Sequence, residues 1–221
     1  MEFAVAILKP FHRICRPFVN GDYLQNIEST YLTDSRYAPD AIDYIRGYHL
    51  LEKELIRLFE FVEPADANLK CYSHQLYALF LRASTEFEAN AKAVLQANGY
   101  LKSGNWNISD YHKLNAATRL SDYSIRIPIW NGTHRTIQPF ASWQTGHSLN
   151  WYQAYNDVKH SRFAKFDCAS LENVVTAVAA VFAVVFSQFH IFTFDPHHPV
   201  LMFNIDNDVW SHDACLRLSL P

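Results

Sequence analysis

Residues 174–186 are the stretch that most constrains how this chain folds, because Thr176 is the only polar residue among them. A helix of this length is too short to cross a bilayer, which requires about 20 apolar residues, and polar residues follow directly from Ser187. The stretch therefore predicts a buried core helix. Asp167 is the expected N-cap of this helix, which reaches about Phe189.

The composition agrees with a chain that buries a sizeable core. The 221 residues are 49% hydrophobic and 19% charged, enough for one large domain or a core domain with an appended piece. The formal net charge of -3 and the pI near 6.4 give no overall attraction to nucleic acid or to an anionic membrane. Any contact with nucleic acid must therefore come from a local patch, and we expect no membrane contact.

The cysteines and the N-terminus indicate a cytoplasmic protein. No two of the four cysteines stand close enough to form a Cys-x-x-Cys clip, which favours reduced thiols over a zinc site. Residues 3–8 are too short for the core of a signal peptide, and no basic stretch precedes them. The cysteines are Cys15, Cys71, Cys168 and Cys215.

Two long amphipathic helices are expected in the first half of the chain. Residues 40–62 carry apolar side chains at alternating spacings of four and three, which places them on one helical face. Residues 73–98 repeat the pattern, and Gly99 suits the C-terminal end of that helix. The second helix also carries a polar line, either an exposed row of ion pairs or a row in which Glu86 faces a site. The line consists of Arg82, Glu86 and Asn90.

The middle of the chain changes from a helical period to alternation. Residues 123–130 and 133–139 alternate between apolar and polar positions, with Asn131-Gly132 between them. Asn-Gly between two such runs predicts a β-hairpin, because both residues tolerate positive φ. The hairpin is either a lid on the core or an arm that binds a protein partner.

These patterns divide the chain into three parts and predict a mainly α fold. Short terminal strands are expected at residues 3–8 and 200–205, and Asn107 or Ser109 is expected to cap a short helix. The parts are an irregular N-terminal segment (residues 1–40), a helical domain (residues 40–190) with the hairpin inserted at about 122–140, and a C-terminal extension with a short strand (residues 191–221).

Residues 148–162 are the best candidate for a functional site. They predict a helix on which Asn156 and His160 lie along one face at a spacing of four. Arg162 lies about 200° round an ideal helix from His160, so the two meet only if the helix frays or if Arg162 serves a second subunit. The stretch carries an amide, an ammonium, an imidazole and a guanidinium: Asn156, Lys159, His160 and Arg162.

The order of helices and this motif resemble the HEPN superfamily of helical bundles. The signature of that family is an Arg followed after four to six residues by His, often with Asn directly after the Arg. Asn156 and His160 fit this spacing, whereas Tyr155 stands where the family has Arg. The resemblance covers about residues 40–190 and implies an up-and-down helical bundle that forms a homodimer.

The resemblance also implies an activity, that of a metal-independent endoribonuclease of the toxin or phage-defence type, without a cofactor. His160 would be the acid and base, because imidazole titrates near neutral pH. Lys159 or Arg162 would hold a phosphate, and Asn156 would orient the imidazole or the ribose. The supporting candidates are Tyr155 and Glu86, the latter to position a cation or the imidazole.

Other interpretations of the sequence remain open. A non-catalytic HEPN-like module would bind a nucleotide, RNA or a protein partner, and Asn156 and His160 would then be a buried polar pair that locks helices. A structural scaffold is a third possibility. A metal site is not expected, because the histidines at 197 and 198 follow a proline turn rather than lying on one helical face. The chain also lacks the Gly-x-Ser-x-Gly elbow of a serine hydrolase.

Overall fold

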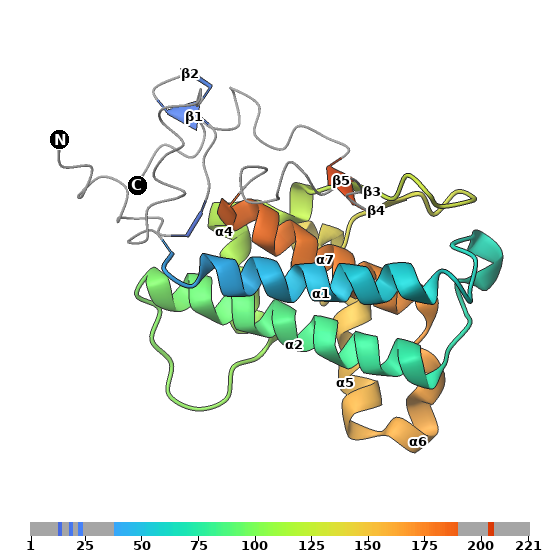
Figure 1. Cartoon of the computed structure of the whole chain (residues 1–221). Helices are drawn as coiled ribbons and strands as arrows, with labels where there is room; N and C mark the ends of the chain where they lie inside the picture. The colour runs from blue at the N-terminus through green and yellow to red at the C-terminus, as the bar shows by residue number, and fades with distance from the viewer. Residues whose placement is uncertain (1–12, 15–17, 20–21, 24–37, 190–202, 206–221) are drawn as a thin grey trace.

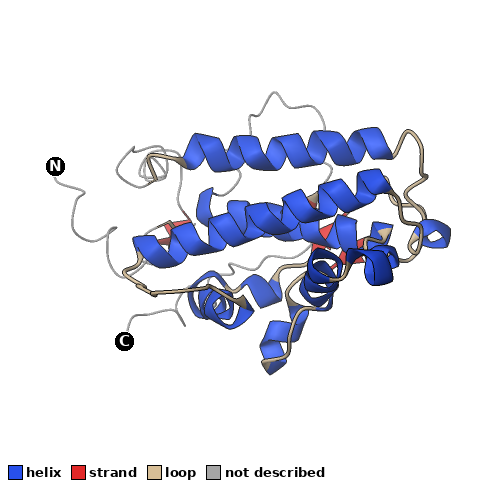
Figure 2. Cartoon of the chain, turned by 90° about the horizontal axis from the view of Figure 1, so that it is seen from below, coloured by secondary structure: helices blue, strands red, loops and turns tan. Residues whose placement is uncertain are grey.

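The computed structural model describes residues 13–14, 18–19, 22–23, 38–189 and 203–205. Within them the chain is mainly helical, as predicted, with a small β-sheet beside the helices (Figure 1). Two of the long helices lie side by side and a third packs against both (Figures 1 and 2). These three are α1 (Ala41–Leu58), α2 (His74–Ala97) and α7 (Leu171–Phe189).

Helix α7 forms the centre of the core. It is long and apolar enough to cross a membrane, with a mean hydropathy of 1.7, but 78% of that stretch is buried within the described fold. The prediction of a buried core helix is therefore confirmed. The predicted N-cap is wrong, because Asp167 lies in the preceding 3-10 helix η6 (Phe166–Cys168). Ser170 stands before α7 instead, and its hydroxyl accepts from the Asn173 backbone N–H at 3.4 Å.

Helices α1 and α2 agree closely with the hydrophobic periodicity. The hydroxyl of Ser73 caps α2 by accepting from the Leu76 backbone N–H at 3.1 Å. Gly99 follows the end of α2 with a φ of 81°, a conformation that favours glycine. Helix α1 ends at Leu58 rather than near residue 62, and a turn in which Val62 N–H donates to the Leu58 carbonyl continues from it.

The predicted hairpin is present, but its strands are short. Strands β3 (Ile125–Arg126) and β4 (Thr136–Ile137) pair in antiparallel fashion, and β5 (Asn204–Ile205) pairs with the other edge of β3. The C-terminal extension therefore contributes a strand, as expected, and this strand occupies the last two residues of the predicted range 200–205. The N-terminal part contains a further small pair, β1 (Phe18–Val19) with β2 (Asp22–Tyr23), where only irregular chain was expected. The strand predicted at residues 3–8 lies outside the described residues.

The register of the hairpin differs from that of a two-residue Asn-Gly turn. Such a turn would place Ile125 opposite Gln138, whereas Ile125 pairs with Ile137. The cause is Asp66 in the 3-10 helix η2 (Asp66–Asn68), which joins α1 to α2. Its carboxylate accepts from the backbone N–H groups of Thr133 and His134, at 2.6 and 2.9 Å.

Asp66 therefore fixes the hairpin tip against the connection between α1 and α2. It also accepts from the indole N–H of Trp130 at 2.8 Å. These hydrogen bonds, first of all that of the Thr133 hydroxyl, hold the pKa of the Asp66 carboxyl well below its usual value. The tip is therefore anchored to the connection between α1 and α2.

Short helical segments connect the hairpin to the bundle and lead into the candidate helix. Asn107 caps α3 (Ile108–Tyr111) as predicted, in a capping box with Asp110. The segments that follow are η3 (His112–Leu114), α4 (Asn115–Thr118), η4 (Leu120–Asp122) and, after β4, η5 (Ala141–Thr145).

Candidate functional site

The helix predicted at residues 148–162 is divided into two. Helix α5 (Asn150–His160) ends at Ser161, whose φ of -135° and ψ of 44° are not helical. Helix α6 (Arg162–Lys165) then starts in a new direction, and α5 and α6 form the lower corner of the molecule in Figure 1. The break separates the guanidinium of Arg162 from the polar face of α5.

The polar face of α5 forms one wall of a surface groove of about 490 Å³. Asn156 is half-buried in it, while Lys159 and His160 are exposed. The predicted spacing of four along the helix therefore brings the amide and the imidazole to one surface. A volume of this size can hold one nucleotide-sized ligand.

Helix α2 and the loop before α3 supply the other walls of the groove. Glu88 and Lys92 lie one helical turn apart on α2 and both face it. Trp106 lies in the loop and is half-buried. The remaining lining residues are Asn105, Asn107, Ile108 and Tyr152.

A hydrogen bond ties α5 to α2 within the groove. The Tyr152 hydroxyl donates to Glu88 Oε1 at 2.7 Å. Burial and this contact with the carboxylate raise the pKa of the Tyr152 hydroxyl, which therefore stays protonated and keeps donating at neutral pH. Tyr152 also packs edge-on against Phe87 and Tyr111, at centroid distances of 6.0 and 6.4 Å. The two helical walls are thus fixed relative to each other.

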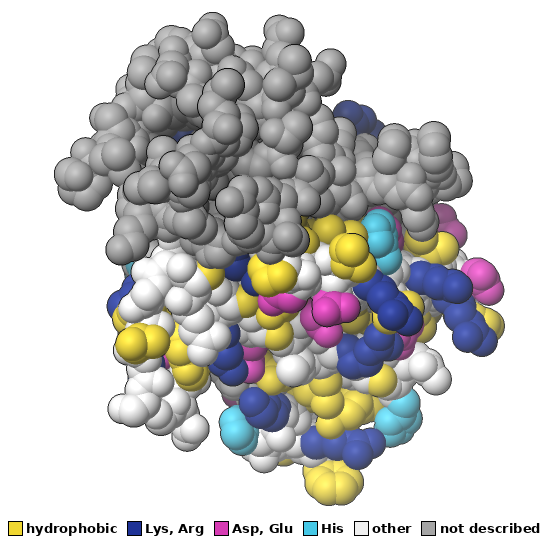
Figure 3. Space-filling view, turned by 60° about the vertical axis from the view of Figure 1, so that its left-hand side comes forward, with side chains coloured by type: hydrophobic (Ala, Val, Ile, Leu, Met, Phe, Trp, Pro, Cys, Tyr) yellow, Lys and Arg dark blue, Asp and Glu magenta, His cyan; other side chains and the backbone are white. Residues whose placement is uncertain are grey.

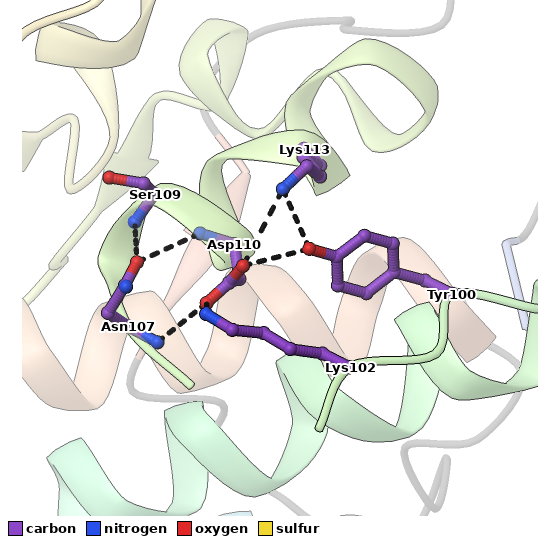
Figure 4. Close-up of polar contacts among 6 residues, drawn as sticks. All are labelled: Tyr100, Lys102, Asn107, Ser109, Asp110 and Lys113. Carbon is purple, nitrogen blue, oxygen red and sulfur yellow. Dashed lines mark hydrogen bonds and ion pairs between the residues drawn. The ribbon is translucent and has the colours of Figure 1, made fainter. Parts of the chain in front are cut away.

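The loop wall is anchored by Asp110, which lies at the centre of the polar contacts in Figure 4. Its carboxylate accepts from the Asn107 backbone N–H at 2.8 Å, from the Lys102 ammonium at 2.7 Å and from the Tyr100 hydroxyl at 2.9 Å (Figure 4). The Lys113 ammonium lies 3.6 Å away. The hydrogen bond from Lys102 is the largest cause of a pKa for Asp110 well below its usual value.

Lys159 keeps a positive charge at the edge of the groove. Its ammonium lies 5.1 Å from the centre of the Tyr155 ring, within cation–π range. A hydrogen bond with the Tyr155 hydroxyl raises the pKa of Lys159. Tyr155 itself is buried and packs edge-on against Phe80 at 6.3 Å, so it supports Lys159 from the core and does not line the groove.

Two further candidates from the sequence, Arg162 and Glu86, also lie outside the groove. The guanidinium of Arg162 stacks over the rings of Tyr77 and Phe166, at 4.9 and 5.9 Å, on the side of α6. Its Nη2 lies 3.4 Å from His74 Nδ1. Arg162 therefore does not join His160, because the chain changes direction at Ser161.

Glu86 faces α1 rather than the groove. A Cβ added to Gly47 would lie 2.9 Å from the Glu86 Oε2 atom, so the carboxylate occupies the space that this glycine leaves open. Burial raises the pKa of Glu86, and Arg82 opposes that rise. Its neighbours in the polar line also face inward or across to α1: Asn90 is fully buried and Arg82 pairs with Glu54.

The residues that sequence reasoning missed come from α2 and the loop. Glu88 and Lys92 form a pair at a spacing of four on the same helix, two positions after Glu86 and Asn90 of the predicted polar line, and that spacing was the available signal. Trp106 is a large aromatic side chain between two asparagines in a stretch expected to be a loop, and loops often carry functional residues. Neither signal indicates which helix the residues would face.

Comparison with known proteins adds nothing to this geometry. No family model, curated protein or solved structure matches the chain. The HEPN resemblance therefore stays a prediction that rests on the order of helices and on the spacing of Asn156 and His160.

Proposed function

We propose that this chain binds single-stranded RNA in the groove between α5, α2 and the loop before α3, and cleaves it without a metal ion. The observation that carries the proposal is the position of His160, which is exposed and shares one groove with Lys159, Lys92 and Trp106. Ammonium groups bind phosphate, and aromatic rings stack on the bases of single strands. An imidazole among them is suited to move a proton on the bound strand.

The distribution of charge over the surface supports an anionic ligand at this end of the molecule. In Figure 3, Lys and Arg side chains are spread over the visible face, and some of them lie with His side chains at the lower end of the view, the end that carries α5 and α6 in Figure 1. The chain as a whole has a net charge of -3, so the positive charge at this end is local. Local positive charge attracts a polyanion even when the total charge is negative.

His160 would act on both protons of the reaction. The ribose 2′-oxygen attacks the adjacent phosphorus and forms the new P–O2′ bond, while the 2′-hydroxyl proton passes to the neutral imidazole. The P–O5′ bond then breaks, and the imidazolium returns the proton to the leaving 5′-oxygen. The products are a 2′,3′-cyclic phosphate and a 5′-hydroxyl, so no proton, water molecule or metal ion is consumed.

The neighbouring groups would stabilise charge and orient the strand. Lys159 and Lys92 would hold the phosphate whose negative charge grows in the transition state. Asn156 lies one helical turn before His160 and would orient the imidazole or the ribose. The HEPN resemblance supports these roles, because Asn156 and His160 are the two motif positions that line the groove. It also supports a homodimer with one groove in each subunit, while the spacing of the cysteines favours a cytoplasmic location.

The test is cleavage of a labelled single-stranded RNA in the presence of EDTA. The wild type is expected to produce fragments that end in a 2′,3′-cyclic phosphate. His160→Ala is expected to lower the rate by about 10²- to 10⁴-fold, the usual contribution of general acid–base catalysis. His147→Ala is the matched control, because His147 is exposed, bonded to Thr145 and absent from the groove lining. Cleavage that EDTA abolishes, or that survives in His160→Ala, would contradict the proposal.

A second candidate function is binding of RNA or a nucleotide without cleavage. It is favoured by two observations: Tyr155 replaces the motif Arg and is buried, and Arg162 lies outside the groove. This alternative predicts that the wild type binds RNA but leaves it intact. His160→Ala would then change only the affinity or the stability of the protein.

A further inference from the structure

Glu88 is the one carboxylate among the described residues that line the groove. The carboxylate ties α5 to α2 through Tyr152, but it would repel a phosphate bound close to it, because two negative charges repel each other at short range. Glu88 and Lys92 are one helical turn apart, yet no ion pair joins them in the described part of the chain. The carboxylate therefore favours a ligand that carries hydrogen-bond donors in addition to a phosphate.

The position of the Glu88 carboxylate is fixed while much of its capacity to accept stays available. The Tyr152 hydroxyl donates to Oε1, and no other hydrogen bond of this side chain occurs in the described residues. The hydrogen bond with Tyr155 is the largest cause of the raised pKa of Lys159, and the charge of Glu88 also contributes to it. A carboxylate has about four acceptor positions on its two oxygens. About three of these acceptor positions therefore remain for donors of a ligand in the groove.

Trp106 supplies a fixed aromatic surface in the same groove. Its ring stacks on Tyr111 with an interplanar angle of 14° and meets Tyr100 edge-on at 5.5 Å. Tyr111 in turn packs against Tyr152, whose hydroxyl holds Glu88. A continuous series of rings thus links the indole to the carboxylate, and the indole can stack on a base.

We propose that this groove selects guanine, with the base stacked on Trp106 and its N1–H and N2–H groups donating to the Glu88 carboxylate. This inference rests on the proposed function, since the ammoniums and His160 would hold the phosphate of the same nucleotide. Guanine carries two adjacent donors on its pairing edge. Adenine and cytosine place an acceptor nitrogen beside their amino group, and uracil places its single N–H between two carbonyls, so each of them would face the carboxylate with an acceptor.

The test compares GMP, AMP, CMP and UMP by isothermal titration of the full chain at low salt. The wild type is expected to bind GMP most tightly. Glu88→Gln is expected to weaken the binding of GMP about tenfold to hundredfold, the range for hydrogen bonds to a charged group. The same variant is expected to leave the affinity for AMP nearly unchanged. Trp106→Ala is expected to weaken the binding of all four nucleotides by about 5- to 150-fold, the range for base stacking.

Glu86→Gln is the matched control, because it makes the same change two residues away on α2 but faces Gly47. It is expected to bind all four nucleotides as the wild type does. Circular dichroism of each variant verifies the fold. Equal affinity of the wild type for the four nucleotides, or a guanine preference that survives in Glu88→Gln, would overturn the inference.

The outcomes of this test are separable from those of the RNA assay. Cleavage that depends on His160 but shows no guanine preference would overturn the role of Glu88 and leave the proposed function standing. RNA cleavage by a protein that binds none of the four mononucleotides would also overturn the role of Glu88 and leave the proposed function standing. Failure to bind any nucleotide together with failure to cleave RNA would overturn both.

Discussion

Asp110→Asn tests whether the loop wall of the groove is held by one carboxylate. The substitution removes the charge that accepts from Lys102, Tyr100 and the Asn107 backbone. Loss of a capping interaction costs about 1 kcal/mol, and loss of a hydrogen bond to a charged group costs about 1.5–3 kcal/mol. The Lys102 side chain is 27% exposed, so the lower end applies, and we expect a total loss of about 2–3 kcal/mol.

The assay is equilibrium unfolding in urea as a function of pH. The folded pKa of Asp110 lies below its unfolded value, so its stabilisation is fully present above the ordinary carboxyl pKa of about 3.9. The stabilisation is lost as the pH falls from there toward the folded pKa. We therefore expect the difference between wild type and Asp110→Asn to be constant from pH 7 to pH 5 and to narrow below about pH 4.

Asp43→Asn is the control for the loss of a carboxylate as such. Asp43 is exposed in the first turn of α1, and its substitution is expected to change the stability by no more than about 0.5 kcal/mol. The anchoring role of Asp110 would be refuted if Asp110→Asn were as stable as this control at pH 7. A difference that stayed constant down to pH 3 would refute the pKa argument.

Three further substitutions test other parts of the structure. Gly132→Ala is expected to lower the free energy of unfolding in urea by about 1–3 kcal/mol, because the φ of Gly132 is 133° and a Cβ there would lie 2.4 Å from Asp66 Cγ. A variant as stable as the wild type would show that Asp66 does not hold the hairpin tip. Phe87→Ala is expected to lower the free energy of unfolding by about 3–5 kcal/mol, because Phe87 is fully buried. Phe163→Ala is the control, since this side chain is 100% exposed, and its free energy of unfolding should lie within about 0.5 kcal/mol of the wild type. Equal losses of stability in the two variants would contradict the burial of Phe87. Arg162→Ala is expected to leave RNA cleavage within about twofold of the wild-type rate in the labelled-RNA assay, because its guanidinium stacks over the rings of Tyr77 and Phe166 and does not line the groove. A loss of rate like that of His160→Ala would show that Arg162 acts in the groove.

The local features of this fold follow from local sequence. The apolar spacing predicted α1 and α2 to within a few residues, because a buried helical face requires that period. Asn107 was predictable as a cap, since its side chain and that of Asp110 satisfy backbone N–H groups only a few residues away. These interactions involve neighbours in the chain and therefore leave a pattern in it.

The features that the sequence did not determine depend on distant residues. The hairpin register is set by Asp66, which stands more than 60 residues before the tip. The position of Arg162 follows from the break at Ser161 and from the rings of Tyr77 and Phe166, none of which alters the hydrophobic period of α5.

The candidate site was predictable only in part, for the same reason. Asn156, Lys159 and His160 share a groove because they lie on one face of one helix, which the spacing indicates. Lys92 and Trp106 complete it from α2 and a loop. Their approach to α5 is a result of tertiary packing, so no single stretch of the sequence contains the whole site.

The most direct test of the account is whether the imidazole of His160 meets the phosphate of a bound RNA strand. Histidine-ring NMR signals can be followed while a 2′-deoxy oligonucleotide, which binds without being cleaved, is added to the full chain. The account predicts that the His160 signals shift in proportion to binding while those of His147 stay in place. Binding that leaves the His160 signals unmoved would show that the strand lies elsewhere and would contradict the account.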